Sequence, residues 1–200
     1  MAYPQHYLGD AKTYLSTNIH PFHFVRHGLT DWNALRYAQG STDIPLNSTG
    51  EAQALNLRAV LLTQKQAGAI KRVITSPLSR ARKTAELATS GLHVEIVHED
   101  GLRERRMGMY EGTVPEVKVY RGNYGDAEVT EVFSRRVARA LGRHCTEEGR
   151  LIVAHGGVLR VILALLGTDV QEELLGNARV LRFQRDGGKW EVTEIAPDGG

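Results

Sequence analysis

Phe22-His23-Phe24-Val25-Arg26-His27-Gly28 joins a short apolar run to a charged end that closes on glycine. The run 22–25 is aromatic and β-branched except for His23, which predicts a buried strand. His23 alternates with two inward-facing phenylalanines, so we expect a structural or outward-facing histidine there rather than a ligand. Residues able to do chemistry therefore begin where this strand would end.

Further apolar runs and helical patterns follow along the chain. The expected strands are 72–75, 93–97 and 151–154. One expected helix begins at Ser48, and three others cover 79–89, 128–144 and 158–166. Ser48-Thr49-Gly50-Glu51 resembles a capping box at the start of the first helix, which Gly68 would end. Residues 180–185 and 189–195 flank a glycine turn and predict a hairpin.

The alternation of strands and helices predicts the fold class. It indicates βαβ units, and hence an α/β fold: a three-layer α/β/α sandwich with a mostly parallel central sheet. A chain of 200 residues suits a single domain, 1–200. Within it, residues 1–20 lack a sustained period and predict an irregular N-terminal arm, while Pro115, Gly122 and Gly125 predict a short loop-rich insertion over 113–127.

The charge balance argues against several classes of protein. The chain has 25 Lys plus Arg and 23 Asp plus Glu, a formal net charge of +2, so we expect no nucleic-acid partner. No apolar run approaches the roughly 18 residues of a membrane span, and residues 1–7 lack the pattern of a secretory signal. With a single cysteine, Cys145, we expect a cytoplasmic protein with no membrane partner. The 19 Arg against 6 Lys indicate either an anion site or a coding bias.

Three of the expected strands end in residues that can do chemistry. Arg26-His27-Gly28 follows the first strand, Ser76-Pro77 with Arg80 follows the second, and His155-Gly156-Gly157 follows the fourth. In a parallel sheet these ends meet at one edge, where ligands bind. A neutral imidazole is a good nucleophile toward phosphorus near neutral pH, and two guanidinium groups can hold the oxygens of a phosphoryl group.

An alkoxide leaving group also needs a proton, so the site should contain a carboxylic acid. Glu104 and Glu111 follow the third strand and are the candidates, and each also suits a solvated surface. This chemistry needs no metal or other cofactor, and the histidines show no metal-ligand spacing. Asp31 and Asp43 likewise lie in no two-metal pattern.

These segments resemble the histidine phosphatase superfamily, in its small-domain, phosphoglycerate mutase-like branch of broad-specificity and α-ribazole phosphatases. The resemblance covers most of the chain and implies a phosphoglycerate mutase-like fold. The matching blocks, in order, are Arg26-His27-Gly28-Leu29-Thr30-Asp31-Trp32-Asn33, Gln39-Gly40, Asp43-Ile44-Pro45-Leu46-Asn47 with Gly50, Ser76-Pro77-Leu78-Ser79-Arg80-Ala81-Arg82-Lys83-Thr84-Ala85, Leu102-Arg103-Glu104, Gly108 to Glu111-Gly112, and Ala154-His155-Gly156-Gly157.

The resemblance also implies roles for individual residues. His27 would be the nucleophile that becomes phosphorylated, and Glu104 would be the general acid. Glu111 is expected to support the local turn instead. The implied catalytic residues are His27, Glu104, His155, Arg26 and Arg80, and the implied substrate-binding residues are Arg26, Asn33, Gln39, Arg80, His155 and Gly156.

Residues and resemblance together predict a metal-independent phosphomonoester hydrolase that acts through a phosphohistidine on a small phosphorylated metabolite. Phosphoglycerate mutase-type phosphoryl transfer is the first alternative, although the insertion offers only Lys118 and Arg121 to hold a second anionic group. A catalytically idle phosphate-binding or regulatory module is the second alternative. Leu29 stands where many relatives carry Glu, Gln or Met, which favours a substrate with an apolar part. A homodimer is compatible with the sequence.

Overall fold

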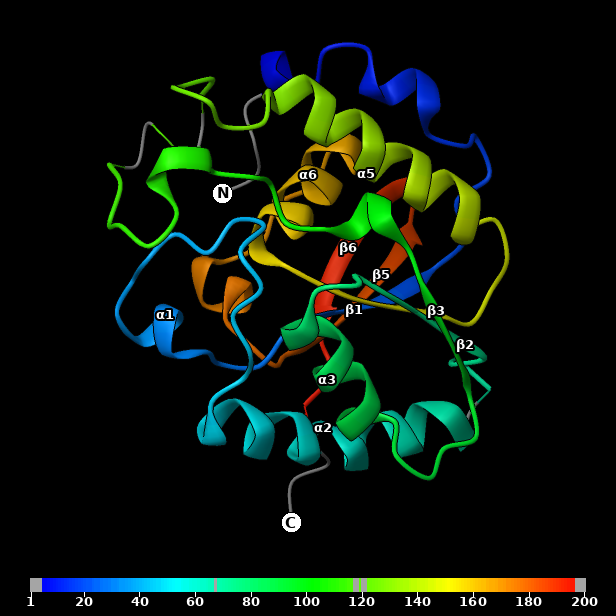
Figure 1. Ribbon diagram of the computed structural model, residues 1–200. Coiled ribbons are helices and arrows are strands. Elements are labelled where there is room, and N and C mark those ends of the chain that lie inside the picture. The colour runs from blue at the N-terminus through cyan, green and yellow to red at the C-terminus, as the bar shows by residue number, and fades with distance from the viewer. Residues whose placement is uncertain (1–4, 67, 117–118, 120–121, 197–200) are drawn as a thin grey trace.

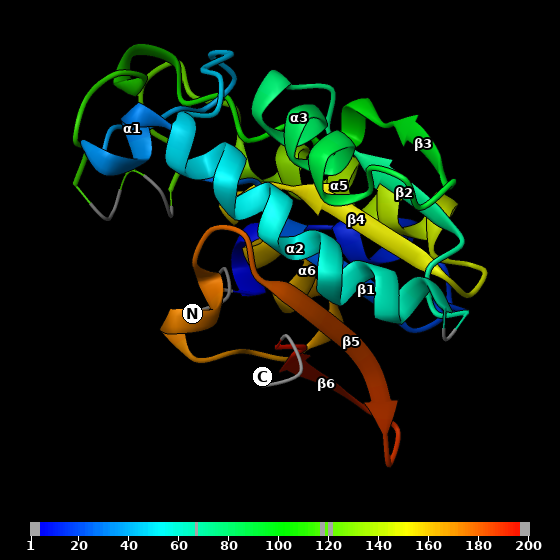
Figure 2. The same cartoon turned by 90° about the horizontal axis from the view of Figure 1, so that it is seen from below.

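Six strands form one central sheet in the computed structural model, which describes residues 5–66, 68–116, 119 and 122–196. The strands are β1 (Phe22–Arg26), β2 (Arg72–Thr75), β3 (Glu95–His98), β4 (Arg150–Ala154), β5 (Val180–Asp186) and β6 (Lys189–Glu194). In the order β3-β2-β4-β1-β5-β6, the first four pair in parallel, and β5 pairs antiparallel with β1 and β6. The mostly parallel sheet and the hairpin are confirmed, and Figure 2 shows the hairpin at the edge opposite β3.

Helices cover both faces of this sheet. The α-helices in the described residues are α1 (Asp31–Ala34), α2 (Ser48–Gln66), α3 (Ser79–Ala88), α5 (Thr130–His144) and α6 (Gly156–Leu166). Five short 3-10 turns join them: η1 (Gln5–Leu8), η2 (Ala11–Tyr14), η3 (Asp100–Leu102), η4 (Gly108–Tyr110) and η5 (Glu172–Leu175). Figure 1 shows α2 and α3 on one side of the strands and α5 and α6 on the other, which confirms the three-layer sandwich.

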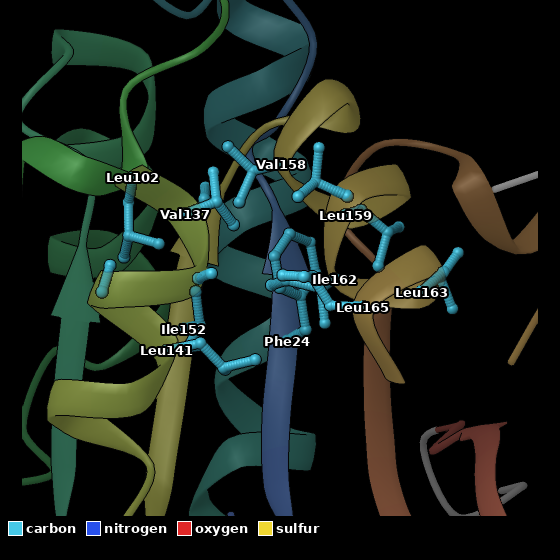
Figure 3. Packing of buried hydrophobic residues seen from close by; sticks show 14 of the residues in the cluster. Phe24, Leu102, Val137, Leu141, Ile152, Val158, Leu159, Ile162, Leu163 and Leu165 are labelled. Atoms are coloured by element: carbon cyan, nitrogen blue, oxygen red, sulfur yellow. The ribbon is translucent and has the colours of Figure 1, made fainter. Parts of the chain in front are cut away.

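The two layers of helix bury opposite sides of the same strands. Because side chains alternate along a strand, Phe24 of β1 packs toward α5 and α6, while Val25 packs toward α2 and α3. Figure 3 shows Phe24 beside Ile162 of the almost wholly apolar helix α6, and Ile152 belongs to the same buried cluster. Burial of these side chains fixes where β1 and β4 end, and hence the position of the residues that follow them.

Two local predictions were wrong in detail. The strand expected over 93–97 begins only at Glu95, because His93, after the turn that follows α3, has a φ of 50° that an extended strand does not adopt. Helix α2 does begin at Ser48, but its cap is Asn47, whose Oδ1 accepts a hydrogen bond of 2.9 Å from the Gly50 amide. The capping box expected at 48–51 therefore gives way to an asparagine cap one residue earlier.

The described part of the N-terminal arm packs on α5. Leu8 and Ala11 are buried against it, and Asp10 accepts hydrogen bonds from Arg135. Cys145 lies just beyond the end of this helix, and burial raises the pKa of its thiol to about 12, as expected for an unreactive cysteine. The predicted insertion lies partly outside the described residues, and the division into domains stays a prediction. Within the described ranges, no helix is both long and apolar enough to cross a membrane.

His23 is a buried structural residue on the α2 side of β1, which excludes the outward-facing alternative. Only 4% of its surface is exposed, and burial, followed by the charge of Arg182, lowers its pKa from 6.5 to about 4. The unfolded chain therefore binds a proton more readily than the folded chain between these two pH values. His23 costs no stability above pH 6.5, and its destabilising effect grows as the pH falls toward 4.

Replacing His23 with glutamine should make the protein less sensitive to acid. The wild type is expected to lose up to about 3 kcal/mol of unfolding free energy through this residue between pH 6.5 and pH 4. Urea denaturation of both proteins at the two pH values measures the difference. Other buried histidines contribute equally to both proteins, so an identical loss in the variant and the wild type would refute the assignment to His23.

Candidate functional site

The carboxyl ends of three neighbouring strands bring the predicted residues together. Strand β4 lies between β1 and β2, so His155 follows the central strand while His27 and Arg80 follow its two neighbours. The ring centroids of His27 and His155 are 5.2 Å apart. Both rings and the Arg80 side chain are buried. Figures 1 and 2 show α1 and the η5 segment (orange) at this same end of the strands.

One ring nitrogen of His27 has a free lone pair. Its Nδ1 lies 2.7 Å from the carbonyl oxygen of Gly28, which only accepts hydrogen bonds, so Nδ1 carries the proton and Nε2 carries the lone pair. Burial, followed by the charges of Arg80 and Arg26, holds the pKa of His27 well below 6.5. The ring is therefore neutral at pH 7, as nucleophilic attack requires.

His155 is oriented by Ser76. The Ser76 hydroxyl accepts a hydrogen bond from the Leu78 amide (3.3 Å) and lies 2.7 Å from Nε2 of His155. When the hydroxyl donates its proton to Nε2, Nδ1 of His155 carries the ring proton and is a buried N–H that can donate to an anion. Burial, followed by the charge of Arg80, lowers the pKa of His155 well below 6.5 as well.

Two arginines complete a ring of donors. Arg80 donates to the carbonyls of Gly40 and Thr42 at 2.8 Å each, and Arg26 donates to the carbonyl of Leu175 at 2.8 Å. Within the described part of the chain, Nε of Arg26, Nε of Arg80 and Nδ1 of His155 are buried and have no hydrogen-bond partner. Unpaired buried donors are costly, so their presence side by side with His27 indicates a site that an anion completes.

The electrostatics of this ring favour an anion. Burial, followed by the charge of Arg160, lowers the pKa of Arg26 to about 10, and the Glu104 carboxylate opposes that shift. Burial likewise lowers the pKa of Arg80. Even so, both guanidinium groups stay positively charged at neutral pH, and the carboxylates of Glu104, Asp43 and Glu111 oppose the shift at Arg80. The oxygens of a phosphoryl group would accept hydrogen bonds from the guanidinium nitrogens that have no partner among the described residues.

Glu104 and Glu111 occupy different places. The Glu104 carboxylate accepts hydrogen bonds from the amides of Arg105 (2.8 Å) and Gly157 (2.9 Å), which sets it beside the start of α6, next to His155. The Glu111 carboxylate instead accepts from the amides of Ser41, Thr42 and Met107. Glu111 thus supports the loop whose carbonyls Arg80 also binds, in agreement with the sequence expectation, and Glu104 is the acid closer to the histidines.

The predicted binding residues differ in how they reach the site. Oδ1 of Asn33 accepts from the amide and hydroxyl of Thr30 in the capping box of α1, so its amide nitrogen is the group left for a ligand. Gln39 is buried, and its Oε1 has no partner among the described residues. Gly156 permits a close approach, because a Cβ there would lie 3.3 Å from Cζ of Arg26. These three roles stay predictions until a ligand is bound.

Sequence reasoning missed the side chains that hold the Arg26–Leu29 turn. The Gly28 amide donates to Thr84 (3.0 Å), the Leu29 amide donates to Gln53 (2.9 Å), and Nδ2 of Asn177 donates to the His27 carbonyl (2.7 Å). These partners are distant in sequence and follow no spacing rule, so no local signal identifies them. Gly50 is explained by the same turn, since a Cβ on Gly50 would collide with the main chain of Leu29.

Asp31 and Asp43, the two aspartates considered as metal ligands, each accept a hydrogen bond from a neighbouring residue. Asp43 accepts a hydrogen bond from the Ser79 amide (2.7 Å), and Asp31 accepts one from the Asn47 side chain (3.1 Å). Over the described ranges, no group of three or more His, Cys, Asp or Glu side chains is placed to hold a metal ion.

Comparison with known proteins agrees with this geometry. The chain is 43% identical over 202 residues to an agropine synthesis reductase of Rhizobium rhizogenes. The match covers 96% of this chain but only 45% of that protein. The chain thus spans less than half the length of the two such reductases that it matches. It is 34% identical to the uncharacterized phosphatase PhoE of Bacillus subtilis (85% and 91% covered). A phosphoglycerate mutase structure from Thermus thermophilus superimposes with a TM-score of 0.70 at 28% identity (89% and 99% covered). Residues 22–197 match branch 1 of the histidine phosphatase superfamily, and the chain belongs to that superfamily.

Proposed function

We propose that the protein hydrolyses a phosphomonoester through a phosphohistidine on His27. The observation that carries this proposal is a set of three buried nitrogens without a hydrogen-bond partner among the described residues, Nε of Arg26, Nε of Arg80 and Nδ1 of His155, around a neutral His27. A phosphoryl group has the oxygens to accept from all three donors. The same arrangement leaves the lone pair of His27 free to attack phosphorus.

The reaction would run in two steps. Nε2 of His27 forms a bond to phosphorus while the ester P–O bond breaks, and Glu104 gives its proton to the leaving oxygen. Glu104, now a carboxylate, then takes a proton from water as the water oxygen attacks the phosphohistidine, which releases inorganic phosphate and restores His27. Arg26, Arg80 and His155, with the amide of Asn33, stabilise the charge on the transferring group.

Activity should persist in mildly acidic solution. Because the pKa of His27 lies well below 6.5, the nucleophile stays neutral at pH values where an ordinary histidine would be protonated. The acid limb of the pH–rate profile would therefore lie below pH 6.5. This expectation agrees with a bell-shaped or acid-leaning profile.

The position of Arg160 supports a second candidate function, in which the enzyme moves a phosphoryl group between two positions of one substrate. Its guanidinium lies beside that of Arg26, and its one hydrogen bond among the described residues goes to the carbonyl of Gly156 at 3.3 Å. A cation with no ion-pair partner in the described part of the chain suits a second anionic group at this place, which a mutase substrate carries. Lys118 and Arg121, the other cations considered for this role, lie outside the described residues.

Hydrolysis and mutase activity make different products. A panel of sugar phosphates, nucleotides, phosphoglycerates, a ribazole phosphate and a phosphopeptide should yield free phosphate with at least one small metabolite as substrate. Isomer exchange on phosphoglycerate without phosphate release would establish the mutase instead. Binding of vanadate without turnover of any member of the panel would establish the catalytically idle module.

The remaining predictions concern the substrate of the enzyme, its location, its partners and its oligomeric state. A small phosphorylated substrate with an apolar part near Leu29, a cytoplasmic location, and the absence of nucleic-acid and membrane partners stay predictions, as does the homodimer. The chain matches less than half of each agropine synthesis reductase, and its substrate could be a phosphorylated compound related to the ones those proteins act on. We propose to include such a compound in the substrate panel.

A further inference from the structure

We infer that Arg136 is a positioning residue that aims the Glu104 carboxyl group at the leaving oxygen; this inference rests on the proposed role of Glu104 as general acid. Glu104 lies in an irregular segment after η3 rather than on a helix or strand. Its carboxylate is held by the amides of Arg105 and Gly157. Those two contacts can orient the carboxylate only if the main chain at Glu104 is itself fixed.

The fork of Arg136 fixes that main chain. Arg136 lies on α5, and its guanidinium donates to the carbonyls of Gly101 (2.9 Å), Arg103 (2.6 Å) and Glu104 (3.0 Å). Its other two N–H groups bind both oxygens of Glu128 at 2.8 Å. All five donors of the guanidinium are therefore used, three of them on the segment that ends at the acid.

Burial and packing hold this fork in one place. The side chains of Arg136 and Glu128 are 23% and 16% exposed, so water competes little for the hydrogen bonds. The guanidinium also lies 4.6 Å from the centre of the Phe133 ring on the same helix. Arg136 is near enough to the site to contribute to the lowered pKa of His155, for which burial is the largest cause. The fork thus connects a rigid helix to the acid-bearing segment.

Lysine cannot reproduce this arrangement. Its ammonium is a single centre with three donors, whereas the planar guanidinium reaches three carbonyls on one side and a carboxylate on the other. Arg136→Lys keeps a positive charge beside the half-buried Glu128, so the fold is retained while the segment 101–104 loses its clamp. The expected loss is in the placement of the acid, and misplacement by about 1 Å can cost roughly 100-fold in rate.

Leaving groups of different basicity test the inference. An alkoxide needs the proton of Glu104 far more than 4-nitrophenolate does, so Arg136→Lys should lower kcat/KM roughly 10- to 100-fold for the best alkyl phosphate of the panel and much less for 4-nitrophenyl phosphate. Glu104→Gln should show the same pattern with a larger loss. Adding Arg136→Lys to Glu104→Gln should cause little further loss, because both changes disable one group.

A matched control lies one residue away. Arg135 is on the same helix but binds Asp10 at the surface, so Arg135→Lys should behave as wild type with both substrates. Should Arg136→Lys fail to fold, Glu128→Gln weakens the same fork from its other end and should give a smaller loss with the same leaving-group pattern. Equal losses for both substrates, or losses that multiply in the double variant, would overturn the inference. If Glu104→Gln itself loses both substrates equally, the acid assignment is wrong, and the role of Arg136 falls with it.

Discussion

Replacing His27 with alanine is expected to abolish covalent labelling and to lower kcat/KM by more than roughly 10⁴-fold. His27 has a protonated Nδ1 bound to the Gly28 carbonyl and a free lone pair on Nε2. The other buried ring of the site, His155, has its Nε2 engaged by Ser76, so it cannot take over the attack. Acid-labile incorporation of ³²P from a labelled substrate, followed in the intact protein, measures the intermediate directly.

His23 provides the control for this experiment. It lies on the same strand, is equally buried, and faces the α2 side of the sheet, away from the site. His23→Asn should therefore be labelled like the wild type near neutral pH. Label retained by His27→Ala, or a wild-type protein that turns over a good substrate without ever being labelled, would contradict the covalent mechanism.

The fold was predictable where burial dominates the sequence pattern. The apolar run 151–154 within β4 and the aromatic run of β1 define strands on their own, and the residues that follow them define the edge at which the site forms. The errors lie where a local choice between similar patterns decides the structure. His93 could extend a strand or precede it, and its positive φ shows that the strand does not include it. Asn47 and Ser48 both suit a helix cap, and nothing in the local pattern selects one of them.

The site was predictable to the extent that it follows the strand ends. His27, Arg80 and His155 meet because parallel strands end together, which spacing along the chain reveals. The contacts of Thr84, Asn177 and Arg136 depend on how helices and loops pack over that edge. Such tertiary contacts leave no periodic signal in a single sequence.

The structure gives part of the arginine excess a physical reason. Each of four arginines donates to main-chain carbonyls of a different loop around the site: Arg26 to Leu175, Arg80 to Gly40 and Thr42, Arg105 to Gly122 and Glu128, and Arg136 to Gly101, Arg103 and Glu104. A planar fork can reach separate carbonyls, and a lysine ammonium cannot. Coding bias remains sufficient for arginines without such contacts. For Arg80, Arg105 and Arg136, each of which reaches two or more carbonyls, the geometry selects arginine over lysine, whereas Arg26 reaches one.

Arg80 should show this preference for arginine most strongly, because it binds the loop and its Nε lies in the proposed phosphoryl site. Arg80→Lys is expected to lower kcat/KM by roughly 10²- to 10³-fold, since one of the preorganised donors around the phosphoryl group is lost. It should also lower the unfolding free energy by about 1–3 kcal/mol, because the carbonyls of Gly40 and Thr42 lose buried donors. Steady-state kinetics and urea denaturation measure the two effects, and vanadate inhibition reports the loss of anion binding separately.

Arg82→Lys is the control that separates the effect of position 80 from the general effect of replacing an arginine of α3 with lysine. Arg82 lies two residues along the same helix and is exposed, so Arg82→Lys removes a guanidinium from α3 without touching the site. Wild-type kinetics, stability and vanadate inhibition are expected for it. If Arg80→Lys matched Arg82→Lys in all three measurements, a point charge would suffice at position 80, and the three unpartnered donors around His27 would not be the phosphoryl site. If it lost stability but kept its vanadate inhibition, Arg80 would serve the loop alone, and anion binding would rest on Arg26 and His155.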